Sequence, residues 1–249
     1  MDIAIILFFI IGAVFGSFFN VIGLRVPKKE PFHNNRSFCP ACKKKLHWHE
    51  LVPMLSYMIQ GGKCGSCHAD ISRIYPLTEA CTGFLFAYSY AHLGFRLELM
   101  AALLLTSLLM IIFVSDMAYM RIPNSILLFF LPLLMAMRII SPLEPWYDAI
   151  IGGAAGIILI ALIIIAFKGG MGAGDMKLFG VLGVVLGWNK VLLAFFLAAF
   201  TGAVIGAMLM LANKVKKKQP IPFGPFIVIG GLISYFYGEQ ILNFYMSLF

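Results

Sequence analysis

The stretch LELMAALLLTSLLMIIFVSD, residues 97–116, decides the class of fold. Its run 98–115 is long and apolar enough to cross a bilayer as one helix, which satisfies its own backbone polar groups at that depth. The run ends at Asp116, and a carboxylate beside the hydrocarbon region is costly and rare without a function. The stretch therefore predicts a membrane helix that ends at a functional acid.

Apolar runs of this kind recur along the chain, which is 61% hydrophobic and 12% charged and has a mean hydropathy of +0.93. This composition excludes a soluble globular domain and predicts an all-α polytopic membrane protein with about eight transmembrane helices. The first run follows acidic Asp2 and has no basic segment before it, so we expect a retained helix and not a signal peptide. Internal Pro132 and Pro225 predict kinks. The expected spans are 3–24, 74–93, 98–115, 122–140, 149–167, 176–188, 190–212 and 221–247.

The distribution of Lys and Arg predicts the orientation of these spans. With the N-terminus outside, 16 of the 19 basic residues fall in cytoplasmic segments and three in outer ones. Because cytoplasmic loops carry the excess of basic residues, we expect an N-out and C-out chain, with Asp116 and Asp175 both at the cytoplasmic face. The net charge of +8 is then a consequence of topology and does not indicate nucleic-acid binding.

Residues 25–73 form a polar, basic loop that contains two CxxC pairs, so the chain divides into a first helix (1–24), this loop, and a helical core (74–249). Paired CxxC knuckles are typical of a four-thiolate zinc site, with Cys39, Cys42, Cys64 and Cys67 as the ligands. Two disulfides are the alternative, but thiols stay reduced on the cytoplasmic side. Four thiolates leave no open position on the ion, which favours a structural zinc that folds the loop.

The sequence allows more than one interpretation of the other polar side chains in and near the loop. Three histidines, His47, His49 and His68, could each replace a cysteine ligand, although surface positions are the simpler interpretation. Cys81 falls within the second expected span, and we expect it to be a packing residue. Glu79, at the start of that span, either hydrogen-bonds across helices and shapes a site or reaches out to water as an interfacial acid.

Asp175 follows four glycines within residues 169–174, which give a backbone that a peptide could approach closely. Taken alone, Asp175 could be a helix N-cap and Asp116 a solvated turn residue. Together, their placement at one membrane face predicts a catalytic pair that shares one proton. In this hypothesis the ionised Asp175, near a helix N-terminus, activates water, and the protonated Asp116 donates to the scissile carbonyl.

The chain resembles the type IV prepilin peptidases, a family of GxGD-type membrane aspartic proteases. The motifs that carry the resemblance occur in order along nearly the whole chain. They are residues 16–21 (GSFFNV) with 25–27 (RVP), the CxxC pairs, residues 71–79 (ISRIYPLTE), Asp116 with 122–124 (IPN), and residues 172–178 (GAGDMKL).

The resemblance implies that Asp116 and Asp175 cleave the leader peptide from prepilins or pseudopilins at the cytoplasmic face of the bacterial membrane. It implies contact with the lipid bilayer and no direct contact with nucleic acid, and it leaves the oligomeric state open. Many members also methylate the new N-terminus with S-adenosylmethionine, and the cysteine loop is associated with those members. The compact length and the loop sequence resemble the competence-type enzymes of Gram-positive bacteria.

Three other interpretations remain open. Presenilin-like and signal-peptide-peptidase enzymes share the GxGD-type aspartate, although they pair it with a YD element where this chain has Ser115 before Asp116. A proton-coupled transporter could use the two acids as relay groups, but such acids tend to lie near the midplane. A pilus-assembly scaffold could use the zinc loop to dock a partner, and its function would then not need the aspartates.

Overall fold

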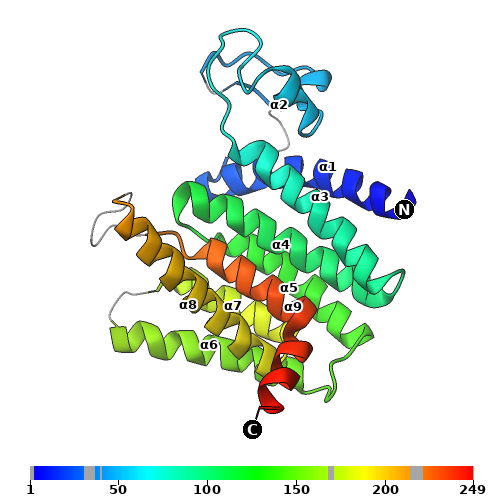
Figure 1. Cartoon of the computed structure of the whole chain (residues 1–249), viewed down its shortest axis with the longest axis vertical. Coiled ribbons are helices and arrows are strands. Elements are labelled where there is room, and N and C mark those ends of the chain that lie inside the picture. The colour runs from blue at the N-terminus through cyan, green and yellow to red at the C-terminus, as the bar shows by residue number, and fades with distance from the viewer. Residues whose placement is uncertain (1–2, 31–36, 40, 168–170, 214–220, 249) are drawn as a thin grey trace. The chain divides into compact units, whose positions relative to one another are not determined.

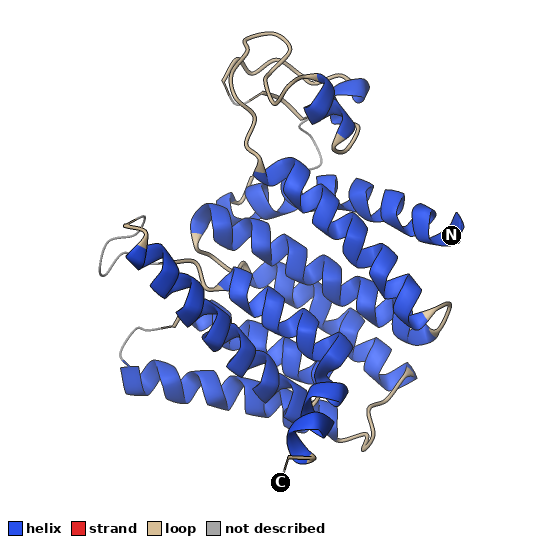
Figure 2. Cartoon of the chain, in the orientation of Figure 1, coloured by secondary structure: helices blue, strands red, loops and turns tan. Residues whose placement is uncertain are grey.

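The computed structural model describes residues 3–30, 37–39, 41–167, 171–213 and 221–248. These residues form helices joined by loops without a strand, apart from two isolated antiparallel bridges, Phe38–Lys45 and Lys63–Asp70 (Figure 2). The chain divides into two compact units, Met1–Val114 and Ser115–Phe249, with the division inside one long helix.

The helices carry the labels of Figure 1. The first unit contains α1 (Ile3–Arg25), η1 (Val26–Lys28), η2 (Trp48–Leu51), α2 (Leu55–Ile59), α3 (Ile74–Leu93) and most of α4 (Leu97–Tyr119). The second unit contains the end of α4, α5 (Asn124–Ile140), α6 (Asp148–Phe167), α7 (Ala173–Leu186), α8 (Trp188–Leu211) and α9 (Gly224–Met246).

Each expected apolar run coincides with a helix, which confirms the all-α class and the multi-pass membrane character. Within the described residues, five helical segments are long and apolar enough to cross a membrane. They are Ile3–Lys28, Leu97–Tyr119, Asp148–Phe167, Trp188–Leu211 and Gly224–Met246. Helices α5, with 17 residues, and α7, with 14, are shorter, as the sequence predicts for the α7 region.

The helix ends near Asp116, Asp175 and Pro225 differ from the sequence-based expectation, and α7 begins at Ala173, three residues before the expected start at 176. Pro225 is not internal, because α9 begins at Gly224 and Pro225 occupies its first turn, where the missing N–H has no cost. Helix α4 continues past its apolar run to Tyr119, so Asp116 lies within the last turn of the helix and not after it. The backbone N–H of Met120 bonds to the Asp116 carbonyl at 2.8 Å and closes this extra turn. Pro132 is internal to α5, as expected.

Helices α1 and α3 of the first unit pack closely because small residues line their contact. A Cβ added at Gly12 would lie 2.7 Å from the carbonyl oxygen of Thr82, and one at Gly16 would lie 2.9 Å from the Cα of Glu79. Small residues at such contacts let membrane helices approach backbone to backbone. The Thr78 hydroxyl also donates to Asn20 Oδ1 at 2.7 Å, which adds a buried hydrogen bond between the two helices.

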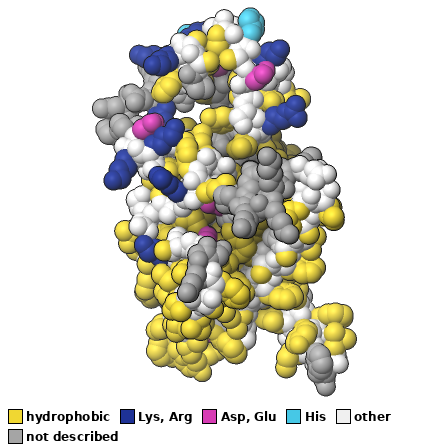
Figure 3. Space-filling model, turned by 90° about the vertical axis from the view of Figure 1, so that its left-hand side faces the viewer, with side chains coloured by type: hydrophobic (Ala, Val, Ile, Leu, Met, Phe, Trp, Pro, Cys, Tyr) yellow, Lys and Arg dark blue, Asp and Glu magenta, His cyan; other side chains and the backbone are white. Residues whose placement is uncertain are grey.

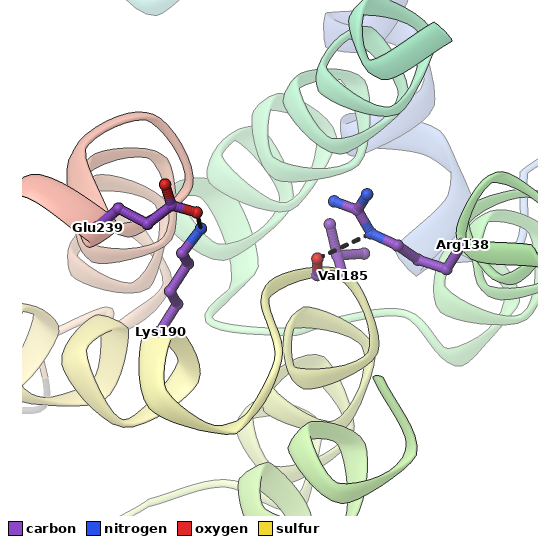
Figure 4. Close-up of polar contacts among 4 residues, drawn as sticks. All are labelled: Arg138, Val185, Lys190 and Glu239. Atoms are coloured by element: carbon purple, nitrogen blue, oxygen red, sulfur yellow. Dashed lines mark hydrogen bonds and ion pairs between the residues drawn. The ribbon is translucent and has the colours of Figure 1, made fainter. Parts of the chain in front are cut away.

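In the second unit, α6 and α7 make the same kind of contact, in which Gly152 meets Gly183 and Gly156 meets the Phe179 backbone. Figure 4 shows two polar contacts that fix other helices of this unit. Buried Arg138 of α5 donates through Nε to the Val185 carbonyl at 2.9 Å, so a carbonyl in the last turn of α7 finds its partner on a neighbouring helix. Lys190 of α8 pairs with Glu239 of α9 at 2.8 Å.

The close contact of α6 and α7 makes Gly156 intolerant of a side chain. We expect Gly156→Ala to destabilise the protein by about 1–3 kcal/mol, because the added methyl group would overlap the Phe179 backbone, which cannot move aside. Thermal unfolding in detergent would measure this loss. Ala154→Val, on an exposed position of the same helix, is the control and should leave the midpoint unchanged. Equal midpoints for both variants would contradict the packing argument.

Candidate functional site

Asp116 is a buried carboxyl group, only 6% exposed, in the last turn of α4. Its Oδ2 accepts a hydrogen bond of 2.7 Å from the backbone N–H of Gly224, the first residue of α9. Since the first N–H groups of a helix have no partner inside the helix, this carboxylate supplies one and also faces the positive end of the helix dipole. The start of α9 therefore provides the polar environment that a carboxylate in an apolar helix needs.

The position of Gly224 admits only glycine. A Cβ at this residue would lie 2.6 Å from Asp116 Oδ2 and 2.8 Å from Asp116 Cβ. This contact gives a physical reason for the glycine in the proline-rich stretch 219–225. Residues 219 and 220 lie outside the described residues. A Gly–Pro pair at a helix start was the available signal, but nothing in it points to Asp116, which is 108 positions away.

The segment after Asp116 turns sharply into α5. The Ser115 hydroxyl is fully buried and donates to the Arg121 carbonyl at 2.6 Å, and Met120 adopts a left-handed conformation with φ of 51°. Pro123 stands directly before the first residue of α5. These features fix the path of the chain at the end of α4 that carries Asp116.

Asp175 lies in the first turn of α7 and is half-buried. Its Oδ2 accepts from the backbone N–H of Gly172 at 2.9 Å, so Asp175 caps its own helix. The capping interpretation is thus partly confirmed, with Asp175 at the third helical position and Gly172 as the N-cap residue. Capping uses one carboxylate oxygen and is compatible with a chemical role for the other. Gly169 and Gly170 of the preceding stretch lie outside the described residues.

Both aspartates and Gly224 belong to the second unit, where several contacts bring their segments together. The carboxyl groups of Asp116 and Asp175 are near enough to interact electrostatically. A Cβ on Gly174 would lie 3.0 Å from Cβ of Ile122, so the glycine lets α7 approach the segment that follows Asp116. The Lys177 ammonium group donates to Asn124 Oδ1 at 2.9 Å and joins α7 to the start of α5. These contacts bring the segments that carry the two acids together within one unit.

In the first unit, the four loop cysteines form a cluster whose sulfur atoms all lie within 4.8 Å of one another. Cys39 and Cys67 are separated by 3.8 Å between sulfurs, and Cys42 and Cys64 by 4.0 Å. Tetrahedral zinc with bonds of about 2.3 Å needs sulfurs about 3.8 Å apart, so the cluster fits that ion. All four cysteines are free, which disfavours the two disulfides.

The two CxxC knuckles have the same backbone structure. In each, the N–H of the residue four positions after the first cysteine bonds to that cysteine's carbonyl, at 2.8 Å for Lys43 and 3.0 Å for His68. Lys43 and His68 both adopt φ of 56°, a left-handed conformation that usually favours glycine. Backbone N–H groups of Cys67 and Ser66 lower the pKa of the Cys64 thiol to about 6, which favours the thiolate that binds metal.

The remaining candidate residues around the loop now have definite positions. In the described part of the chain, the metal-type cluster consists of cysteines alone, and the rings of His47 and His49 stack on each other instead. Cys81 is half-buried in α3. Glu79 does not reach out to water, because it is 7% exposed and accepts the Met54 backbone N–H at 2.8 Å. It therefore joins the loop to α3.

Almost the whole chain is similar in sequence to known proteins and to models of known protein families. The model of the bacterial Peptidase A24 N-terminal domain matches residues 10–93, and that of the type IV leader peptidase family matches residues 103–207. A Bacillus subtilis protein named prepilin leader peptidase/N-methyltransferase is 44% identical over 240 residues, which cover 96% of this chain and 97% of that protein. Proteins of the same name from Pseudomonas aeruginosa and Aeromonas salmonicida are 31% and 35% identical, with 96% and 85% of this chain and 92% and 75% of their own lengths covered. No solved structure matches the chain.

Proposed function

Because this chain belongs to the type IV leader peptidase family, we propose that it is a membrane aspartic endopeptidase that removes the leader peptide of type IV prepilins or competence pseudopilins. The observation that carries the proposal is that Asp116 and Asp175, from α4 and α7, lie in one unit, in segments that the Gly174–Ile122 and Lys177–Asn124 contacts hold together. The relatives named prepilin leader peptidase/N-methyltransferase support the substrate class. The competence-type substrate rests on the resemblance in compact length and loop sequence.

In this mechanism the two carboxyl groups share one proton, since like charges at close range do not both ionise. The ionised member takes a proton from water, and the oxygen of that water attacks the scissile carbonyl carbon. The protonated member donates to the carbonyl oxygen, and a proton then passes to the leaving amine as the C–N bond breaks. We assign the first role to Asp175, which is the more exposed acid, and the second to Asp116, which is buried.

The hydrogen bonds at the two acids fix the directions of their carboxyl groups. Each uses Oδ2 to accept a backbone N–H at the start of a helix, from Gly224 for Asp116 and from Gly172 for Asp175. A carboxyl group fixed by one oxygen presents its other oxygen in a defined direction. Preorganisation of this kind spares the enzyme a reorganisation during the reaction.

The proposed topology has eight spans, the N- and C-termini outside, and the aspartates at the cytoplasmic face of the bacterial cytoplasmic membrane. The placement of 16 basic residues on that side supports it. A prepilin presents its short leader on the cytoplasmic side and its hydrophobic helix within the membrane. The scissile bond at their boundary would then lie at the depth of the two acids.

We assign a structural zinc ion to Cys39, Cys42, Cys64 and Cys67, whose sulfur spacing fits a tetrahedral site. When bound, zinc would hold the two knuckles together and supply no chemistry, because four thiolates fill its coordination. The names of the relatives also support a second activity, N-methylation of the new N-terminus with S-adenosylmethionine. No residue of this chain is assigned to the methyl donor.

Replacement of either acid should abolish cleavage while leaving the fold intact. For Asp116→Asn and for Asp175→Asn we expect kcat/KM to fall by about 100- to 10,000-fold, because neither amide can take part in the proton transfers. The measurement is loss of the leader from a purified prepilin in detergent. Asp148→Asn is the control, since Asp148 accepts the Trp188 N–H at the start of α8 and has no catalytic role. Normal cleavage by both site variants would return the transporter and scaffold interpretations.

Gly224→Ala tests the hydrogen bond that holds Asp116. The added methyl group would displace the Asp116 carboxyl group or the start of α9, and a buried polar group left without its hydrogen-bond partner costs about 1–3 kcal/mol. We therefore expect kcat to fall by about 10- to 100-fold with little change in KM. Gly206→Ala in α8 is the matched control, because its nearest neighbour, Ile221 Cδ1, lies at an ordinary 3.7 Å. Equal activity in the two variants would show that Asp116 does not depend on Gly224.

Metal analysis tests the cysteine cluster separately from cleavage. We expect one zinc ion per wild-type chain and almost none in Cys42→Ser, because the site then lacks one thiolate. Cys81→Ser, at a half-buried position in α3, should keep its zinc. Leader cleavage should persist in Cys42→Ser, since both acids lie in the other unit. Zinc retained by Cys42→Ser would exclude the four-thiolate assignment.

A further inference from the structure

The cysteine loop carries an exposed apolar face outside the expected membrane spans. Leu55, Met58 and Ile59 are 57%, 74% and 84% exposed, and they make up most of the five-residue helix α2. Their spacing of i, i+3 and i+4 places them on one face of the helix. Exposed apolar side chains are ordinary where a span faces lipid, but a contiguous set on a polar loop indicates a binding surface.

A hydrogen bond fixes the position of this face relative to α3, which the sequence predicts to be a membrane span. Met54, directly before α2, donates its backbone N–H to buried Glu79 at 2.8 Å. Glu79 lies five residues into α3, which begins at Ile74, and so about 8 Å along the helix axis from its first residue. Under the proposed topology that end of α3 is cytoplasmic. The apolar face therefore starts at the level of the lipid headgroups and not in the bulk solvent.

Basic side chains occur at the ends of α1 and α3 that adjoin the loop and directly after α2, which suits a membrane surface. Lys29 follows α1 closely, Arg73 immediately precedes α3, and Lys63 follows α2, and all three side chains are exposed. On the face drawn in Figure 3, Lys and Arg side chains gather on the cysteine loop, whereas hydrophobic side chains dominate the helical elements. Basic residues beside apolar ones are the composition with which peripheral helices bind anionic bilayers.

We propose that α2 is an interfacial anchor, in which Leu55, Met58 and Ile59 insert into the cytoplasmic leaflet while Lys29, Lys63 and Arg73 contact anionic headgroups. The anchor adds a further attachment for the loop, beside the Glu79 bond and the chain ends at α1 and α3. It rests on the proposed topology and not on the cleavage reaction. The hydrophobic segment of a prepilin is the competing occupant of the same face.

Tryptophan quenching in reconstituted vesicles tests the anchor directly. Trp48, Trp146 and Trp188 are replaced by Phe, and Ile59→Trp is introduced into this background. In vesicles of phosphatidylcholine and phosphatidylglycerol with brominated acyl chains, we expect Ile59→Trp to lose most of its emission. Lys45→Trp, at an exposed knuckle position, should keep its emission. Equal quenching of the two variants would overturn the proposal. In a second arm, a prepilin with a brominated hydrophobic segment is added to vesicles of unbrominated lipid. If Ile59→Trp loses emission only in that arm, the prepilin and not the leaflet occupies the face, and the proposal is also overturned.

Two further measurements separate the contributions, and the second of them does not depend on the Trp-free background. With phosphatidylcholine alone, quenching should weaken, because the basic residues lose their anionic partners; unchanged quenching would remove the electrostatic part of the proposal. In the otherwise unaltered chain, Met58→Glu with Ile59→Glu should speed tryptic cleavage of the loop in vesicles several-fold. Gln60→Glu, which adds charge on another face of the same turn, should not. Equal cleavage rates in these two proteins would contradict insertion of α2.

Discussion

The hydrogen bond from Gly224 to Asp116 is the contact on which the second unit and its chemistry depend. A carboxyl group buried in an apolar helix is tolerated only if a donor faces it, and here the donor is the first N–H of α9 at 2.7 Å. The same bond gives α9 a partner for an N–H that its own helix leaves unpaired. A side chain at position 224 would occupy the space of the carboxylate, so the contact requires glycine. One bond thus fixes the start of a helix and the direction of a candidate catalytic group.

Much of this fold follows from the sequence because the length of an apolar run predicts a membrane helix. The expected run 74–93 coincides with α3, and the run 122–140 differs from α5 by two residues at its start. The errors occur where a helix end depends on polar contacts. Asp116 was expected after α4, but its carbonyl accepts from Met120 and extends the helix by a turn. Pro225 was expected inside α9, but the helix begins only where Asp116 accepts the Gly224 N–H.

In the site too, sequence motifs predict some residues, whereas others can be recognised only from their contacts in the folded structure. Motif and membrane placement singled out Asp116 and Asp175, and both lie in one unit within electrostatic reach. Gly224 could not be assigned, because its contribution is a backbone N–H that every residue except proline carries. In the loop, cysteine spacing predicted the sulfur cluster. It could not predict the left-handed Lys43 and His68, since intrinsic preference would place glycine there. The hydrogen bonds that close each knuckle override that preference.

The two centres differ in what they can contribute to a reaction. Four thiolates around one ion leave no coordination position for water or substrate, so the cysteine cluster can shape a surface but cannot activate a nucleophile. Two carboxyl groups that share a proton can act as base and acid in turn, and they need no metal to do so. The cluster lies wholly in the first unit and both acids in the second, so the proposed chemistry of cleavage uses no group of the cluster. A second activity that used the loop would then use it as a surface, and not a metal ion at the cluster as a reagent.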